Sequence, residues 1–239
     1  MSLSIPVLPE QEEIAQDARR GAASFRYFVR AAWSVLEPGT PLIWSDKTWH
    51  LDAVCLHLQA VYNREILRLL VNIQPGVAKS TLFSVMWPAW CWLHDASIRW
   101  LCASHSMDNA IRDNKNCRDL IQSTWYQARW GHLFEMKGDQ NVKTYFENDH
   151  RGYRMAVAVR SSGTGKRGTH LLIDDPNNAM AGQADIEAVK TWFGRLWVPR
   201  LNDQKTGAMV VVGQRMGEND LSSHILGLGG WEHLNLPTE

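Results

Sequence analysis

The sequence has 239 residues, in which 25 lysines and arginines balance 25 aspartates and glutamates. This balance argues against a histone-like protein that binds nucleic acid through its overall charge, although it leaves room for a local basic patch. Hydrophobic residues make up 45% of the chain, which is enough to bury the core of one large domain or two small ones.

Neither the cysteines nor the N-terminal segment indicates export or membrane insertion. The four cysteines form no C-x-x-C pair and have no zinc-like spacing with histidine, which favours buried thiols in a reducing cytosol over a metal site. The N-terminal segment is too polar for a signal peptide, and no apolar run approaches the length of a membrane-spanning helix. We therefore expect an intracellular protein that does not associate with a membrane.

The N-terminal part of the chain is predicted to form helices followed by a buried strand. Residues 8–36 are expected to be helical, and residues 49–65 carry apolar side chains at helical spacing. The apolar run at 66–73 is typical of a strand that is buried on both faces of a parallel sheet. This pattern predicts an N-terminal helical extension over 1–48 and a main domain over 49–239.

Strands and helices alternate along the rest of the chain. We expect a helix at 80–93, a strand at 98–104, a helix at 106–123, a hairpin of 141–149 and 153–160, a strand at 170–175, a helix at 185–201, a strand at 207–215 and a short helix at 219–227. No helix or strand is expected in the tail HLNLPTE. The alternation predicts an α/β fold with a mainly parallel central sheet flanked by helices.

The octapeptide QPGVAKST, residues 74–81, lies where a predicted strand gives way to a predicted helix. A phosphate cradle needs backbone N–H groups around a concavity, a helix N-terminus, a cation and a hydroxyl for Mg²⁺. Lys79 can reach the β- and γ-phosphates, Ser80 can ligate Mg²⁺, and Thr81 can add a bond to a phosphate oxygen. The segment therefore has the chemical groups that a nucleotide site requires.

The same segment departs from the usual phosphate-loop pattern, G-x-x-x-x-G-K-[ST]. Ile73 and Ala78 hold the places of its two glycines, and the loop supplies one flexible residue, Gly76, next to Pro75. The alternative interpretation is an ordinary strand-to-helix loop with an exposed lysine, and the eight residues alone leave both open.

The segment LLIDDP places Asp174 and Asp175 at the end of an apolar strand. Buried carboxylates are costly unless they meet a cation, and ligands of open α/β sheets bind at the carboxyl ends of strands. Asp174 would hold the magnesium water shell and Asp175 would act as general base, whereas an Asp-Pro turn is an equally simple interpretation of the pair. Together with Lys79 and Ser80, the pair predicts a P-loop NTPase with an extra strand between the two motifs.

Two further segments carry candidate residues. Gln214 and Arg215 follow a buried strand, where the amide could sense a γ-phosphate and the guanidinium could pass on the signal. The glycine-containing segment 160–170 carries Arg160 and Arg167, either of which could act as an arginine finger. An ordinary strand end is the alternative for the first segment. A solvated loop, or one that contacts DNA phosphates, is the alternative for the second.

The chain contains, in this order, the segments WHLDAVCLHLQAV, LLVNIQPGVAKSTLFSVMWPAW, RWLCASHS, LLIDDP and GAMVVVGQRMGENDL. They resemble the ATPase half of the large terminase subunit of tailed bacteriophages, over a region from about Trp44 to the C-terminus. That family often has an altered glycine pattern before its Lys-Ser pair, so the missing glycines are compatible with a cradle. The resemblance implies a P-loop NTPase of the ASCE or RecA-like type, an ATPase that uses ATP and Mg²⁺.

By this resemblance, Asp174 falls on the magnesium aspartate, and Mg²⁺ would be held by Asp174 and Ser80. Asp175 falls where related motors more often have glutamate, so its carboxylate would be a general base with a shorter reach. Gln214 and Arg215 fall on the motif that couples hydrolysis to movement. The nucleotide itself would be bound by Gln74, Pro75, Gly76, Val77, Ala78, Lys79, Ser80 and Thr81, with Trp49 and His50 near the adenine.

Residues 74–78 lack the arginine that some relatives carry in this loop. A motor that works as a ring completes each site with a positive charge from the neighbouring subunit. The basic loop at 160–167 is the expected source, through Arg160 or Arg167.

The resemblance also implies partners and a place of action. The motor would package double-stranded DNA into a procapsid in the host cytoplasm, as a ring that engages the portal protein and the small terminase subunit. The nuclease domain of full-length relatives is expected to be absent from this chain. Two other functions stay open, a helicase-like DNA-dependent ATPase and a catalytically weak P-loop assembly module.

Overall fold

A computed structural model describes residues 9–161, 165–178 and 180–236. In these residues the core is an eight-stranded sheet with the strand order β3-β4-β5-β2-β6-β7-β1-β8. The strands from β5 to β8 in this order are parallel, and β3 and β4 are antiparallel at one edge. Their bounds are β1 Arg68–Asn72, β2 Arg99–Ser104, β3 Met136–Val142, β4 Tyr145–Asn148, β5 Tyr153–Ala158, β6 His170–Asp174, β7 Ala208–Gly213 and β8 Glu232–Asn235.

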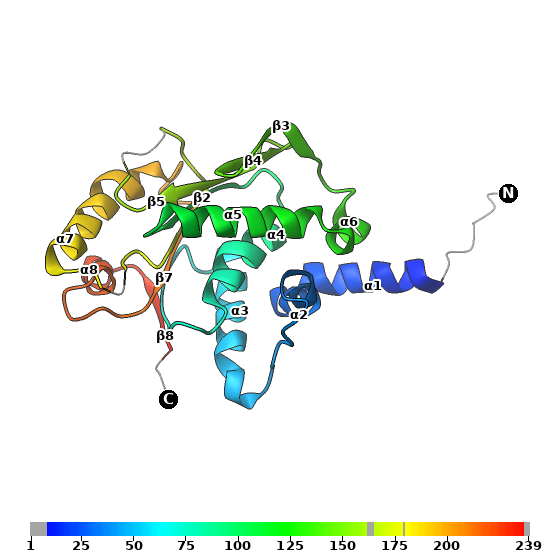
Figure 1. The fold of residues 1–239 in the computed structure, drawn as a ribbon, viewed down its shortest axis with the longest axis horizontal. Helices are drawn as coiled ribbons and strands as arrows, with labels where there is room; N and C mark the ends of the chain where they lie inside the picture. Colours follow the sequence, from blue (N-terminus) through cyan, green and yellow to red (C-terminus); the bar gives the residue numbers. More distant parts are fainter. Residues whose placement is uncertain (1–8, 162–164, 179, 237–239) are drawn as a thin grey trace.

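Helices cover both faces of the sheet (Figure 1). They are α1 Pro9–Ala23, α2 Phe25–Leu36, α3 Trp49–Tyr62, α4 Trp87–Cys91, α5 Met107–Gln122, α6 Thr124–Trp130, α7 Gln183–Trp192 and α8 Leu221–Leu228, with shorter 3₁₀ or π turns at Asp46–Thr48, Thr81–Met86, Phe193–Trp197 and Val198–Arg200.

Side chains of the strands alternate between two cores. Leu69 and Val71 pack toward α2 to α6, whereas Leu70 packs toward α7 and α8. Burial on both faces explains why the strands read as continuous apolar runs, and it confirms the predicted α/β fold with helices on both sides of a mainly parallel sheet.

Strand β7 lies between β1 and β6, so the order across the site is β8-β1-β7-β6-β2. One strand therefore lies between the strand that precedes Lys79 and the strand that ends in Asp174, which agrees with the predicted extra strand between the two motifs. The register pairs Asn72 of β1 with Gly213 of β7, and Val212 of β7 with Asp174 of β6. Because these parallel strands end level with one another, the loops that follow them meet at one edge of the sheet.

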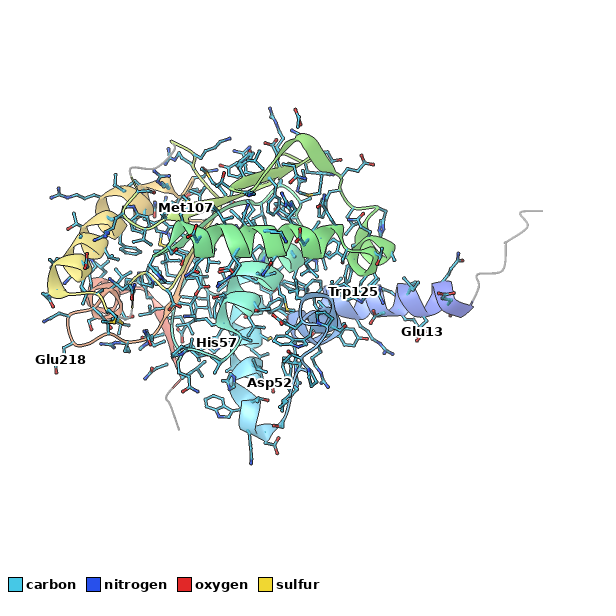
Figure 2. The ribbon with its side chains drawn as sticks, viewed as in Figure 1. Glu13, Asp52, His57, Met107, Trp125 and Glu218 are labelled. Atoms are coloured by element: carbon cyan, nitrogen blue, oxygen red, sulfur yellow. The ribbon has the colours of Figure 1, made fainter. Side chains whose placement is uncertain are left out.

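The segment before residue 49 packs into the same core as the sheet. Phe25 and Phe28 of α2 are fully buried in the cluster that contains the α4 and α6 side chains. On the other side of α2, the Nε atom of Arg26 lies 2.5 Å from Asp52 Oδ1 of α3. Figure 2 shows Asp52 on α3 and Trp125 on α6, two of the helices whose side chains contact α2. The N-terminal helices therefore contribute core, not only surface.

Two strands differ from the expectations. The tail contains β8, which pairs in parallel with the free edge of β1, so the prediction of no element there was wrong. Two of its four residues are exposed and two are half-buried, so the strand lacks an apolar pattern. The expected strand at 141–149 is instead divided by a tight turn at Lys143 and Thr144 into β3 and β4. The polar sequence of β3 gave no strand signal.

The helix expected at 80–93 begins with a π turn over Thr81–Met86. Pro88 has no N–H, so it cannot donate the usual i→i−4 bond to the carbonyl of Ser84. That carbonyl accepts instead from Nη2 of the buried Arg154, at 2.6 Å. The Ser84 hydroxyl donates to Asp174 Oδ2 at 3.0 Å. The π turn thereby connects the helix to β5 and β6.

Among the described residues, no helix is both long enough and apolar enough to cross a membrane.

Acid should destabilise the protein through His170, at the start of β6. Its ring is 1% exposed and packs on Trp100, with 4.7 Å between ring centroids, and burial lowers the pKa of this imidazole from 6.5 to about 3. Between these values the unfolded chain binds a proton that the folded chain does not, so stability is present above pH 6.5 and is lost as pH falls toward 3.

Through His170, each drop of one pH unit within this range should raise the equilibrium constant of unfolding by up to about tenfold. His170→Phe should flatten the decline in denaturation midpoint as pH falls from 6.5, because the ring volume is kept and the titrating group is removed. His150→Gln, at an exposed site, is the control. Equal acid slopes for wild type and His170→Phe would contradict this account.

Candidate nucleotide site

The loop after β1 turns sharply before the helix begins. Gly76 has φ 84° and Ala78 has φ 58°, and the carbonyl of Ala78 accepts from Leu82 N at 3.0 Å. Ala78 thus adopts a left-handed conformation at the place where the usual phosphate loop has its second glycine. A left-handed conformation at an alanine strains the backbone of the loop.

Replacing Ala78 with glycine should therefore stabilise the chain slightly. Relief of the left-handed strain is worth about 1 kcal/mol, and the greater freedom of glycine in the unfolded chain offsets part of it. We expect a denaturation midpoint equal to or above that of wild type. The matched control is Ala188→Gly at an exposed position inside α7, which should lose about 1 kcal/mol. Equal losses in both variants would show that the positive φ is not strained.

Lys79 lies almost fully buried at the start of the helix, beside the two carboxylates at the end of β6. Its side chain is 6% exposed and forms an ion pair with Asp175 Oδ2. Its Nζ atom lies 3.7 Å from Asp174 Oδ1. The predicted cation and the predicted acidic pair, which are distant in the sequence, therefore form one cluster. In this conformation the ammonium group is held by the carboxylates.

Asp174 is the more deeply buried of the two acids, at 3% exposure. Burial raises the pKa of this carboxyl from 3.8 to about 6, against the opposing effects of Lys79 and the Ser80 hydroxyl. Asp174 Oδ2 accepts from Ser84, whereas its Oδ1 atom has no hydrogen-bond partner among the described residues. A buried carboxylate oxygen without a hydrogen bond, close to a serine hydroxyl, is a donor set that suits Mg²⁺. The residues present thus fit the expected metal ion.

Asp175 leaves the strand in a left-handed conformation, with φ 49°. Its N–H donates to Val212 O at 2.9 Å, and its carbonyl accepts from His105 N at 3.0 Å. A Cβ built on Gly213 would lie 3.1 Å from Pro176 Cδ and 3.4 Å from Asp175 Oδ1, so the end of β7 packs closely on this turn. These contacts hold the backbone in the strained conformation and direct a carboxylate that is 35% exposed toward Lys79.

A pocket of about 400 Å³ opens above this cluster. It is lined by Glu37, Pro75, Gly76, Ala78, Lys79, Ser80, Thr81, Val85, Arg112, Asp113, Asn116 and Asp175. A smaller hollow of about 130 Å³ lies against other residues of the same loop and is lined by Lys47, Trp49, His50, Ile73, Gln74, Val77 and Leu236. The structure therefore brings Trp49 and His50, the predicted adenine residues, beside the loop after β1.

Gln214 and Arg215 follow the inserted strand β7. The amide of Gln214 is half-buried and reaches Met216 Sδ at 3.7 Å, and neither residue lines the pocket around Lys79. Arg215 turns away from it, with Nε 3.0 Å from Asp220 Oδ2 and Nη2 2.7 Å from the Ser223 hydroxyl. Since Asp220 caps α8, the side chain of Arg215 contacts the start of that helix and not the carboxylates.

The two candidate finger arginines lie away from Lys79. Arg160 has φ 67° and pairs with Asp185 of α7 at 2.5 Å, beside a separate hollow of about 320 Å³. Arg167 donates from Nη2 to the carbonyls of Pro199 and Leu201, each at 3.2 Å. Residues 162–164 of the predicted finger loop lie outside the described residues. Neither arginine lines the pocket around Lys79 of its own chain.

Sequence reasoning missed three residues at this edge of the sheet. Asn72 ends β1 and donates to the Ser222 hydroxyl at 2.9 Å and to Gly213 O at 3.3 Å, so it ties the loop entry to β7 and α8. A polar residue that closes an apolar strand could have marked it. Ser84 and Arg112 lie on helices, where nothing in the local pattern distinguishes them from surface residues.

Solved structures of phage terminases share this fold. The large terminase of a thermophilic bacteriophage superposes with a TM-score of 0.50 and 9% sequence identity, over 81% of this chain and 46% of the terminase chain. The HK97 bacteriophage large terminase gives a TM-score of 0.51 and 12% identity, over 88% of this chain and 40% of that one.

The chain spans less than half the length of these two terminases. No protein-family model matches the sequence, and no curated protein matches it significantly. At 9% and 12% identity the likeness establishes a shared fold and nothing finer. The chain is therefore similar in fold to the large terminases of tailed bacteriophages, as its sequence motifs suggest.

Proposed function

We propose that this chain is an ATP-hydrolysing motor domain of a viral DNA-packaging terminase. The observation that carries the proposal is the cluster of Lys79 with Asp174 and Asp175, at the loop after β1 and the end of β6. A buried lysine, two carboxylates and a left-handed loop, all at the carboxyl ends of parallel strands, are the parts that binding and hydrolysis of a nucleoside triphosphate need.

ATP would bind across both hollows beside the loop. The triphosphate would lie over residues 74–81, where backbone N–H groups and the helix N-terminus attract anions. Lys79 would leave Asp175 and donate to the β- and γ-phosphate oxygens. The adenine would lie against Trp49 and His50, since their hollow adjoins Gln74 and Val77 of the same loop.

Ser80 and Asp174 would hold Mg²⁺, which supplies positive charge to the β- and γ-phosphates as negative charge develops on them. Asp175, once released by Lys79, would accept a hydrogen bond from the attacking water and take its proton. Its side chain is 35% exposed, which gives water access to the carboxylate. Gln214 would respond to the γ-phosphate from the end of β7 and pass the change to α8 through Arg215 and Asp220.

Packaging requires partners that are part of the same proposal. The chain would act in the host cytoplasm in a ring of copies, with the portal protein and the small terminase subunit, on double-stranded DNA. Arg160 and Arg167 would serve the site of the neighbouring copy, which is compatible with their distance from the pocket around Lys79 in their own chain.

The test is ATP turnover by the purified chain with Mg²⁺, with and without double-stranded DNA. We expect Mg²⁺-dependent ATP binding and slow hydrolysis, with turnover per subunit that rises with protein concentration and with DNA. ATP binding without any hydrolysis would favour an assembly module, and failure to bind ATP at millimolar concentration would overturn the proposal.

A further inference from the structure

The pocket above the phosphate loop contains a second cation that no motif predicts. Of the described residues that line it, only Lys79 and Arg112 carry a positive charge, and the loop itself, residues 74–78, has no arginine. Arg112 lies on α5, which follows β2 and packs against the π turn that begins at Thr81.

The guanidinium of Arg112 is held in place from one side. Its Nε and Nη2 atoms each lie 2.8 Å from Oδ1 of Asp113, a carboxylate that is 4% exposed. Among the described residues no other hydrogen-bond partner of the Arg112 guanidinium is found, and its side chain is 54% exposed. Arg112 therefore combines a fixed inner edge with N–H groups that face outward beside the pocket.

Two cations, Lys79 and Arg112, and three carboxylates, Glu37, Asp113 and Asp175, line the described pocket. Lys79 is paired with Asp175 and lies close to Asp174, so Arg112 is the cation of the described pocket lining that keeps donors available for a ligand. Arginine presents a planar fork of N–H donors that matches phosphate oxygens. A cation beside the γ-phosphate stabilises the negative charge that develops there in the transition state of phosphoryl transfer.

Resting on the proposed ATPase function, we propose that Arg112 is the arginine that contacts the terminal phosphate of ATP from within the same chain, in place of an arginine in the phosphate loop. Asp113 is its positioning residue.

Arg112→Ala should lower kcat by about 100-fold or more, the scale seen when one transition-state donor is lost. It should also reduce the preference for ATP over ADP roughly tenfold, because only ATP carries the terminal phosphate that a charged donor would bind. Arg112→Lys should recover part of the ATP preference and little of the rate, since lysine keeps the charge and loses the fork. Asp113→Asn should lower kcat less than Arg112→Ala does.

The matched control is Arg118→Ala, on the same helix and outside the pocket, where the guanidinium donates to Asn141 Oδ1 at 2.9 Å. It should leave kcat and the ATP/ADP ratio unchanged. Titrating fluorescent ATP and ADP analogues measures the ratio even in variants without turnover. Circular dichroism and the denaturation midpoint verify that Arg112→Ala and Arg118→Ala are folded alike.

Mixing Arg112→Ala with Asp175→Asn separates a contact within one chain from a contact between copies. A residue that acts in its own chain leaves every subunit of the mixture defective, so turnover should stay low. Rescue in the mixture would overturn the assignment to the same chain, and wild-type kcat with an unchanged ATP/ADP ratio in Arg112→Ala would overturn the contact itself. Failure of the wild type to bind ATP would instead overturn the proposed function on which this inference rests.

Discussion

Lys79→Ala should abolish ATP binding and hydrolysis. The ammonium group is the only cation of the loop that could neutralise the β- and γ-phosphates, and a charge-assisted contact of this kind has no substitute among residues 74–81. We expect kcat/KM to fall by at least about three orders of magnitude. Fluorescent-nucleotide titration and phosphate release measure the two effects separately.

The same substitution should cost stability, because it leaves the carboxylates without their cation. Removing one partner of a buried pair is strongly destabilising, but Asp175 is one-third exposed and water will screen it. We expect a loss of about 2 kcal/mol, which follows mainly from the fully buried Asp174. Adding Asp174→Asn to Lys79→Ala should recover part of this stability and none of the ATP binding.

Lys115→Ala is the control for charge removal. Lys115 is 59% exposed on α5 and pairs with Asp119 at 2.7 Å, an interaction worth well under about 1 kcal/mol. Wild-type ATP turnover in Lys79→Ala, with Lys115→Ala also unaffected, would exclude the loop after β1 as the phosphate site.

Asp175→Asn should leave the protein folded and strongly lower kcat for ATP hydrolysis. Asparagine tolerates a left-handed backbone as well as aspartate does, so the φ of 49° is no obstacle to the variant. Loss of a general base lowers kcat by roughly two to four orders of magnitude. Asp119→Asn, on the exposed face of α5, should leave kcat unchanged.

ATP affinity in Asp175→Asn should equal or exceed that of wild type. Asp175 holds Lys79 in an ion pair, and ATP must break this pair to gain the ammonium group. Replacing the carboxylate with an amide removes the competing anion. Weaker ATP binding would mean that Asp175 contacts the nucleotide complex in another way, and normal turnover would place the general base elsewhere.

Much of the fold and of the candidate site could be predicted from local patterns in the sequence. The alternation of apolar strands with amphipathic helices set the α/β class, because burial on both faces leaves continuous apolar runs. Lys79 and Asp174 could be chosen because each follows such a run, and the carboxyl ends of parallel strands meet at one edge of the sheet. A strand at 207–215 followed from the same alternation, whereas its place between β1 and β6 came from the structure.

Only the tertiary structure decided the contacts between distant segments. The parallel pairing of β8 with β1 depends on a free strand edge, which leaves no trace in the sequence of β8. Arg154 donates to the Ser84 carbonyl across 70 residues of chain, and that carbonyl is available because Pro88 has no N–H to offer it. Arg112 enters the pocket because α5 packs on the helix of the loop.

The sequence by itself determined which residues carry charge and hydroxyl groups at the strand ends, since periodicity and burial are properties of neighbouring residues. It could not determine that Lys79 rests on Asp175, or that Ala78 takes the glycine conformation. Both depend on how the strands β1, β7 and β6 align and on the close approach of Gly213 to Asp175, and alignment across a sheet is fixed only when the whole core packs.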